Sequence, residues 1–122
     1  MAGRQSMPRV NFAGCSILLV EDEPSIALHI AACFESACAR VLRARDVQEA
    51  LCIVESRRVS AALLDSRLSE DPALCKRLAE HGIPVVVHSG YRELHAACRE
   101  GVIAGVPANP QFLLTTVADL LV

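Results

Sequence analysis

Aromatic residues and charge are both scarce in this sequence. Of its 122 residues, 3% are aromatic, none is Trp, and 21% are charged, with a formal net charge of −2. Nucleic-acid-binding surfaces are typically rich in basic residues with aromatic side chains among them, and this chain has no such excess. We therefore expect no direct binding to nucleic acid.

Long hydrophobic runs are also missing, although 52% of the residues are hydrophobic. No apolar run approaches the roughly 20 residues that a membrane span needs. The first 14 residues, MAGRQSMPRVNFAG, lack the apolar centre of a signal peptide. We expect no membrane contact and a cytoplasmic location, with residues 1–14 as a flexible arm and residues 15–122 as a single packed domain.

Neither the cysteines nor the histidines have the spacing of a metal site. No CxxC, HxxxH or HxxE pattern occurs, so we expect no zinc site. The cysteines lie in apolar segments, and we interpret them as small buried hydrophobic residues rather than a disulfide framework. These residues are Cys15, Cys33, Cys38, Cys52, Cys75 and Cys98, and His29, His81, His88 and His95.

Short aliphatic runs alternate along the chain with longer segments of helical period. The predicted strands are 16–20, 39–44, 61–65, 83–89 and 102–107. The predicted helices begin near Pro24 and cover 47–58, 71–82, 91–101 and 110–122, with Asp46 and Asp71 as N-caps and Gly82 as a helix stop. The first helix should bury one face, formed by Ile26, His29, Ile30, Cys33, Phe34 and Ala37.

Strands joined by helices in this way form a parallel sheet covered on both faces, which predicts a doubly wound α/β domain. In such domains ligands bind beyond the carboxyl ends of the strands. Polar residues stand at those ends, and we expect them to converge on one edge of the sheet. They are Glu21 and Asp22, Asp65, Ser89, and Asn109 with Pro110.

Four motifs in this order resemble the receiver domain of bacterial two-component response regulators. They are LLVEDEP, AALLDSRL, VVVHSG and ANPQF, and the resemblance covers the chain from about residue 15 onward. It implies a flavodoxin-like (βα)5 fold with a five-stranded parallel sheet in the order 2-1-3-4-5. The stretch VHSGY also resembles a variant of the Phe-Ala-Thr-Gly-Tyr signature of the alphaproteobacterial FAT GUY response regulators.

The resemblance implies a Mg²⁺ site at the acidic residues. Asp22 and Asp65 would bind the ion directly, Glu21 through water, and Arg67 through its backbone carbonyl, because Mg²⁺ takes a few oxygen ligands and keeps several waters. Glu23 would instead begin the first helix. Asp65 would accept a phosphoryl group from a histidine kinase or phosphotransfer protein, so the chain would signal rather than act as an enzyme on other substrates.

Further residues take their expected roles from the same resemblance. Ser89 would donate a hydrogen bond to the acyl phosphate, with the backbone amide of Gly90 or Ser66 as another donor. Tyr91 either gates the pocket or lies on the surface of helix 91–101. The bond between Asn109 and Pro110 is expected to be cis.

Three departures from the family pattern bear on activity. Asn109 replaces the usual lysine, Val106 stands where a switching aromatic residue is common, and the loop after Asp65 lacks its customary Pro and Gly. Asn109 carries no charge, so the phosphate loses a counter-charge. Arg67 either supplies that charge or points into solvent.

Three functions follow. The leading one is a stand-alone receiver that signals by binding a protein, since the chain ends at helix 110–122. The alternative is a degenerate receiver that binds partners without phosphorylation. A Mg²⁺-dependent phosphohydrolase fits poorly, because its nucleophile would follow the first strand in a DxD pattern and the sequence there reads Glu21, Asp22, Glu23.

Overall fold

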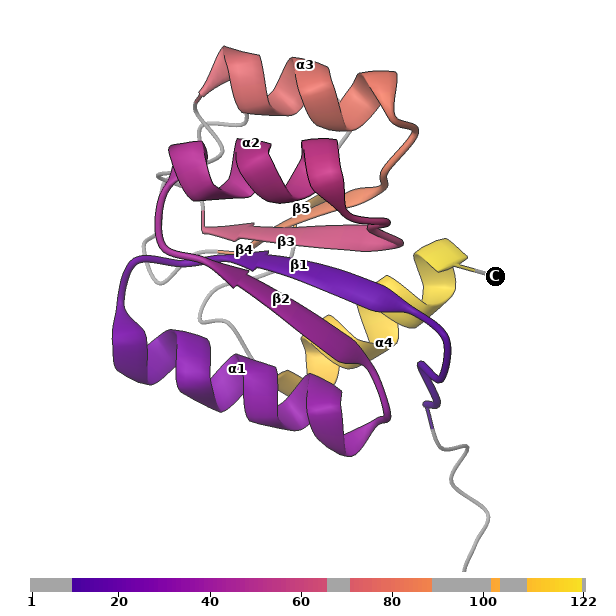
Figure 1. The fold of residues 1–122 in the computed structure, drawn as a ribbon. Helices are drawn as coiled ribbons and strands as arrows, with labels where there is room; N and C mark the ends of the chain where they lie inside the picture. Colours follow the sequence, from indigo (N-terminus) through magenta and orange to yellow (C-terminus); the bar gives the residue numbers. More distant parts are fainter. Residues whose placement is uncertain (1–9, 66–70, 89–101, 104–109, 122) are drawn as a thin grey trace, which may run out of the picture.

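Five parallel strands form one sheet in the order β2-β1-β3-β4-β5 (Figure 1). This computed structural model describes residues 10–65, 71–88, 102–103 and 110–121. The strands are β1 (Ser16–Val20), β2 (Arg40–Ala44), β3 (Ala61–Asp65), β4 (Val85–His88) and β5 (Val102–Ile103). The predicted flavodoxin-like fold class and strand order are confirmed.

Helices cover both faces of the sheet. Figure 1 shows α1 (Pro24–Ser36) and α4 (Pro110–Leu121) on one face, and α2 (Val47–Ser56) and α3 (Pro72–Glu80) on the other. Each begins within a residue of its predicted start. The helix expected over 91–101 lies outside the described residues.

Alternating side chains of the strands fill two separate cores. In β1, Ile17 and Leu19 pack toward α1 and α4, whereas Leu18 and Val20 pack toward α2 and α3. Successive strand residues point to opposite faces, so a strand covered on both sides needs an aliphatic side chain at every position. The strand β2 lies at an edge of the sheet, and its Arg40 and Arg43 are exposed.

The buried face of α1 matches the predicted one in part: Ile30 and Phe34 are buried as expected, and Cys33 and Ala37 are partly buried against the same core. The structure buries Ala27, Ile30, Ala31 and Phe34, which follow the i, i+3, i+4, i+7 spacing of one helix face. Ile26, by contrast, is 44% exposed. His29 is also exposed. Small alanines therefore face the sheet and let the helix approach it closely.

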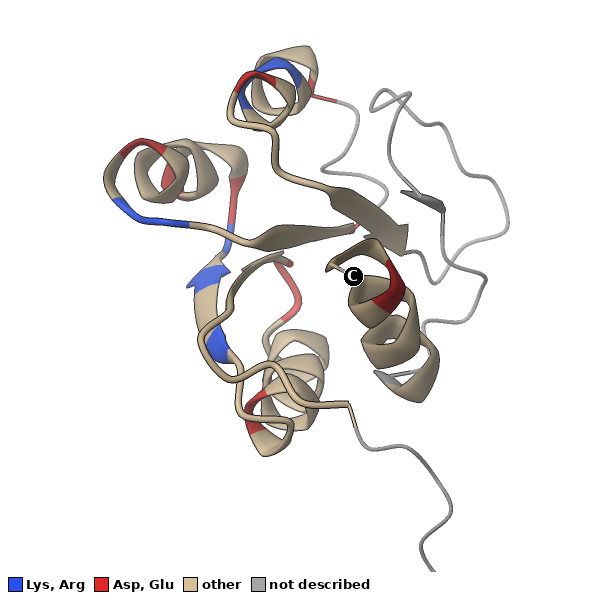
Figure 2. Ribbon diagram, turned by 90° about the vertical axis from the view of Figure 1, so that its right-hand side faces the viewer, with Lys and Arg blue, Asp and Glu red and all other residues tan. Residues whose placement is uncertain are grey.

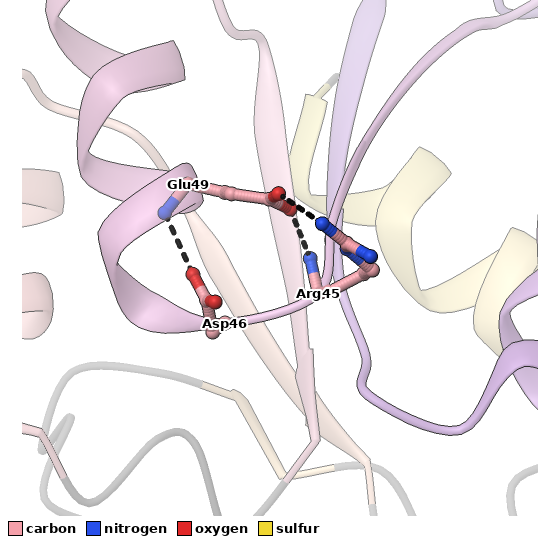
Figure 3. Close-up of polar contacts among 3 residues, drawn as sticks. All are labelled: Arg45, Asp46 and Glu49. Carbon is pink, nitrogen blue, oxygen red and sulfur yellow. Dashed lines mark hydrogen bonds and ion pairs between the residues drawn. The ribbon is translucent and has the colours of Figure 1, made fainter.

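The helix α2 begins with a set of reciprocal hydrogen bonds (Figure 3). The Asp46 carboxylate accepts a hydrogen bond from the Glu49 N–H at 2.9 Å, as predicted for an N-cap. Glu49 Oε1 in turn accepts from the Arg45 N–H at 2.8 Å, and Glu49 Oε2 pairs with the Arg45 guanidinium at 3.0 Å. These bonds from Arg45 lower the pKa of Glu49.

The described cysteines contradict the prediction of small buried hydrophobic residues without disulfides, and Cys98 lies outside the described residues. Cys38 and Cys52 are exposed, and Cys15 and Cys33 are only partly buried. All four are free, whereas Cys75 is disulfide-bonded. Spacing along the chain does not predict these exposures, because they depend on the tertiary packing around each cysteine.

The packed chain begins before the expected boundary at residue 15. Phe12 is 2% exposed, and its ring stacks on Phe34 with the ring centroids 5.4 Å apart. Its N–H donates to the Ala37 carbonyl at 2.7 Å. The segment before β1 thus closes the core beneath α1.

Among the described residues, no helix is both long and apolar enough to cross a membrane.

The ends of α1 and α3 provide a matched pair of positions for a stability test. Cys38 and Gly82 have φ angles of 73° and 67°, in the left-handed region. The residue after each donates to the carbonyl five residues back, Ala39 to Phe34 at 3.0 Å and Ile83 to Leu78 at 2.9 Å.

We expect Gly82→Ala to lower the free energy of unfolding by about 1 kcal/mol, because a Cβ disfavours this conformation. A Cβ at Gly82 would meet no atom within 4 Å, so no clash adds to that effect. Cys38→Gly should raise the free energy of unfolding by a similar amount. Urea denaturation measures both, and a stabilising Gly82→Ala or a destabilising Cys38→Gly would contradict this account.

Candidate functional site

Three acidic side chains lie where β1 and β3 end. Glu21 and Asp22 directly follow β1, and Asp65 is the last residue of β3. The two strands are neighbours in parallel register, so their carboxyl ends meet at the same edge of the sheet. Glu21 and Asp65 are 2% and 6% exposed, whereas Asp22 is exposed. Figure 2 shows the acidic turn after β1 between the sheet and α1.

One carboxylate oxygen from each of Glu21, Asp22 and Asp65 lies within 4.8 Å of the others. At about 5 Å and an effective dielectric constant of about 20, two unit charges repel by about 3 kcal/mol. A divalent cation would offset this repulsion. Mg²⁺ fits the donor set, because it prefers carboxylate oxygens and keeps several waters. This is the only such group of His, Cys, Asp or Glu within the part of the chain that the structure describes.

Local hydrogen bonds hold the carboxylates of Glu21 and Glu23 in different places. Glu21 Oε2 accepts from the Glu23 N–H at 3.0 Å, which holds the Glu21 carboxylate at the start of the turn. The Glu23 carboxylate instead caps α1 and accepts from the Ser25 N–H at 3.0 Å. That bond lowers the pKa of Glu23. The prediction that Glu23 begins the first helix is confirmed.

His88 is a site neighbour that the sequence analysis did not find. It ends β4 and pairs in register with Asp65. It is 2% exposed, and its Nε2 lies 3.7 Å from Glu21 Oε1. Burial lowers the pKa of His88, while the nearby charge of Asp65 opposes this shift. The signal that could have found it is a single histidine that ends the otherwise aliphatic run VVVH.

Several predicted site residues lie outside the described residues. Their roles and the expected cis bond before Pro110 therefore stay predictions. These residues are Ser66, Arg67, Ser89, Gly90, Tyr91, Val106 and Asn109. What the structure brings together is the acidic group of Glu21, Asp22 and Asp65, with His88 beside it.

The charge density of this group leads to a prediction about stability. In chelator, Asp22→Asn and Asp65→Asn should raise the melting temperature, because each removes one of three mutually repelling charges. Wild type should gain about 1.4 kcal/mol, or about 5 °C, in ~10 mM Mg²⁺ if the dissociation constant is ~1 mM. Both variants should lose most of this gain.

The control is Asp119→Asn, which removes an exposed charge from α4, away from the strand ends. This variant should keep the full Mg²⁺ response. Differential scanning calorimetry with and without Mg²⁺ gives the comparison. An equal Mg²⁺ response in wild type and Asp65→Asn would show that the ion does not use this group.

Comparison with known proteins finds similarity at the level of structure. No protein-family model and no curated protein matches the chain. A CheY-like response regulator receiver domain protein from Methanospirillum hungatei JF-1 has 24% identity and a TM-score of 0.75, over 88% of this chain and 93% of that one. A two-component response regulator from Clostridium difficile has 21% identity and a TM-score of 0.76, over 88% and 95%.

A third similar structure contains a metal ion. The receiver domain of a sensor histidine kinase from Pseudomonas aeruginosa PAO1 has 22% identity and a TM-score of 0.75, over 89% of this chain and 98% of that one. In that protein a magnesium ion is coordinated in the active site cleft. These similarities show that this chain has the receiver fold. They leave the FAT GUY subtype a prediction from the sequence.

Proposed function

We propose that the chain is a receiver domain that accepts a phosphoryl group on Asp65, acting in the cytoplasm with a histidine kinase or phosphotransfer protein as donor. The observation that carries this proposal is the grouping of Glu21, Asp22 and Asp65 within 4.8 Å at the carboxyl ends of adjacent strands. An isolated aspartate at a strand end would more simply be a turn former. A turn-forming role does not explain why three carboxylates at the ends of two strands, two of them buried, lie so close together.

Asp65 is the nucleophile in this proposal. One of its carboxylate oxygens attacks the phosphorus of a phosphohistidine, and a new O–P bond forms as the P–N bond breaks. The histidine nitrogen keeps the electron pair of the broken bond and takes up a proton. Asp65 ends β3, which pairs with β1 on one side as far as Leu64 and with β4 on the other, where Asp65 itself pairs with His88. Such positioning is most of what phosphoryl transfer needs from a protein.

Glu21 and Asp22 would hold Mg²⁺ together with Asp65. When bound, the ion neutralises charge that builds on the transferred oxygens. By the resemblance to receiver domains, Ser89 and the amide of Gly90 would donate hydrogen bonds to the acyl phosphate, and the Arg67 carbonyl would complete the metal ligands.

Incubation with Mg²⁺ and acetyl phosphate tests this proposal directly. Intact-mass measurement should show one added phosphoryl group on wild type and none on Asp65→Asn, because the amide is a poor nucleophile. Asp119→Asn should behave as wild type. Uptake by Asp65→Asn at the wild-type rate would assign the nucleophile elsewhere, and release of phosphate in many turnovers would indicate a phosphohydrolase.

Asn109 favours a second candidate function, a degenerate receiver that binds a partner without phosphorylation. An amide can donate a hydrogen bond but cannot offset the charge of a phosphoryl group. Arg67 is the nearest cationic residue in sequence to Asp65, and its guanidinium could meet phosphate through two hydrogen bonds.

These alternatives differ in their response to Arg67→Ala and Asn109→Lys. If Arg67 compensates, Arg67→Ala should slow phosphorylation or speed loss of the phosphoryl group, and Asn109→Lys should partly rescue the double variant. Time courses of intact mass give both rates. Equal rates for wild type and Arg67→Ala exclude compensation, and uptake by Asn109→Lys but not by wild type favours the degenerate receiver.

A further inference from the structure

His88 is a buried nitrogen donor beside the acidic group. It is 2% exposed, and its Nε2 has no hydrogen-bond partner among the described residues. That atom lies 3.7 Å from Glu21 Oε1. A buried polar atom without a hydrogen bond is rare, because it has lost its hydrogen bonds to water and gained none in the protein.

The strand pattern explains why this imidazole faces the acidic group. His88 follows Val86 by two residues in β4, and Asp65 follows Leu63 by two residues in β3. Val86 and Leu63 both pack in the core between the sheet and α1 and α4. Since strand residues two apart share a face, His88 and Asp65 lie on that same face.

The distance between His88 Nε2 and Glu21 Oε1 leaves no room for a bridging water. A bridging water makes two hydrogen bonds of about 2.8 Å, which places its partners roughly 4.5 Å or more apart. The 3.7 Å gap is too short for that. A hydrogen bond between these two atoms would require them to approach by about 0.8 Å, which a small side-chain rotation can supply. His88 is also not part of the group whose ligand atoms lie within 4.8 Å of one another.

We propose that His88 is a positioning residue for the metal site, whose Nε2–H holds the Glu21 carboxylate in the orientation that joins its oxygens to those of Asp22 and Asp65. This inference rests on the proposed function, because it assumes that the three carboxylates bind a divalent cation. The Glu23 N–H holds Glu21 Oε2 at 3.0 Å, and His88 approaches Oε1. One hydrogen bond on each of the two oxygens would fix the plane of the carboxylate.

Hydrogen-bond donors without a permanent positive charge suit this task. The two helices that the structure describes on this face of the sheet, α1 and α4, contain no Lys or Arg, as Figure 2 shows. An amide N–H and an imidazole N–H can orient Glu21 through hydrogen bonds, without a lysine or arginine beside the carboxylate. A carboxylate beside Nε2 also favours the tautomer with the proton on that nitrogen. Residues that orient metal ligands from outside typically contribute about 10- to 100-fold in metal affinity.

The test compares His88→Leu with His88→Gln in binding of Mg²⁺ and Mn²⁺, measured by isothermal titration calorimetry. Leu removes the donor, and Gln keeps an N–H at a similar reach. We expect His88→Leu to lower the affinity for both ions by about tenfold or more. The affinities of His88→Gln should stay within about threefold of those of wild type. His29→Leu, which removes an exposed imidazole from α1, should leave both affinities unchanged.

Each outcome bears on the proposal. Wild-type affinity in His88→Leu would overturn it. A loss in His88→Leu much larger for Mn²⁺ than for Mg²⁺ would also overturn it, because a direct imidazole ligand selects the softer ion. No binding of either ion by wild type would overturn the proposed metal site itself, and this inference with it.

A measurement on the wild-type protein covers the case in which His88→Leu does not fold. Nitrogen-15 NMR of the histidine rings distinguishes the two neutral tautomers. We expect His88 to carry its proton on Nε2, with that proton shifting downfield on addition of Mg²⁺ as its hydrogen bond to Glu21 shortens. A proton on Nδ1, or a resonance insensitive to Mg²⁺, would contradict the positioning role.

Discussion

The parallel register of β1, β3 and β4 is the constraint on which the site depends. It aligns the carboxyl ends of the three strands, and side-chain alternation then sends Asp65 and His88 to one face. Burial of carboxylates is unfavourable unless they are held and compensated. The aliphatic residues that fill both cores provide the energy to hold them there. The acidic group is thus a property of the sheet and cannot form from the turn after β1 alone.

Much of the fold could be predicted because its signals are local. Aliphatic runs marked the strands, and Asp46 and Asp71 marked helix starts through hydrogen bonds to residues only three positions away. The face of α1 was predicted correctly at Ile30 and Phe34 but wrongly at Ile26 and His29, for the opposite reason. Alanines at 27 and 31 give a weak hydrophobic signal, yet their small size suits close packing on the sheet, while the larger Ile26 is exposed.

The site, like the fold, was predictable where its signals are local in sequence. Glu21, Asp22 and Asp65 stand at strand ends that the sequence marks clearly, and parallel pairing brings them together. His88 escaped notice because its environment depends on tertiary pairing with Asp65 and on burial beside Glu21, neither of which a single strand reveals. The exposed Cys38 and the disulfide-bonded Cys75 escaped for a related reason, since exposure and pairing of cysteines depend on contacts distant in sequence.

The exposed arginines of β2 bear on how the protein avoids self-association. An edge strand offers backbone N–H and C=O groups on its outer side to any strand that approaches. Arg40 and Arg43 stand on this edge, so a second copy adding its own β2 would bring guanidinium groups against guanidinium groups. Their mutual repulsion disfavours extension of the sheet from one molecule to the next. The same two residues that add nothing to the core therefore disfavour edge-to-edge pairing of two molecules through β2.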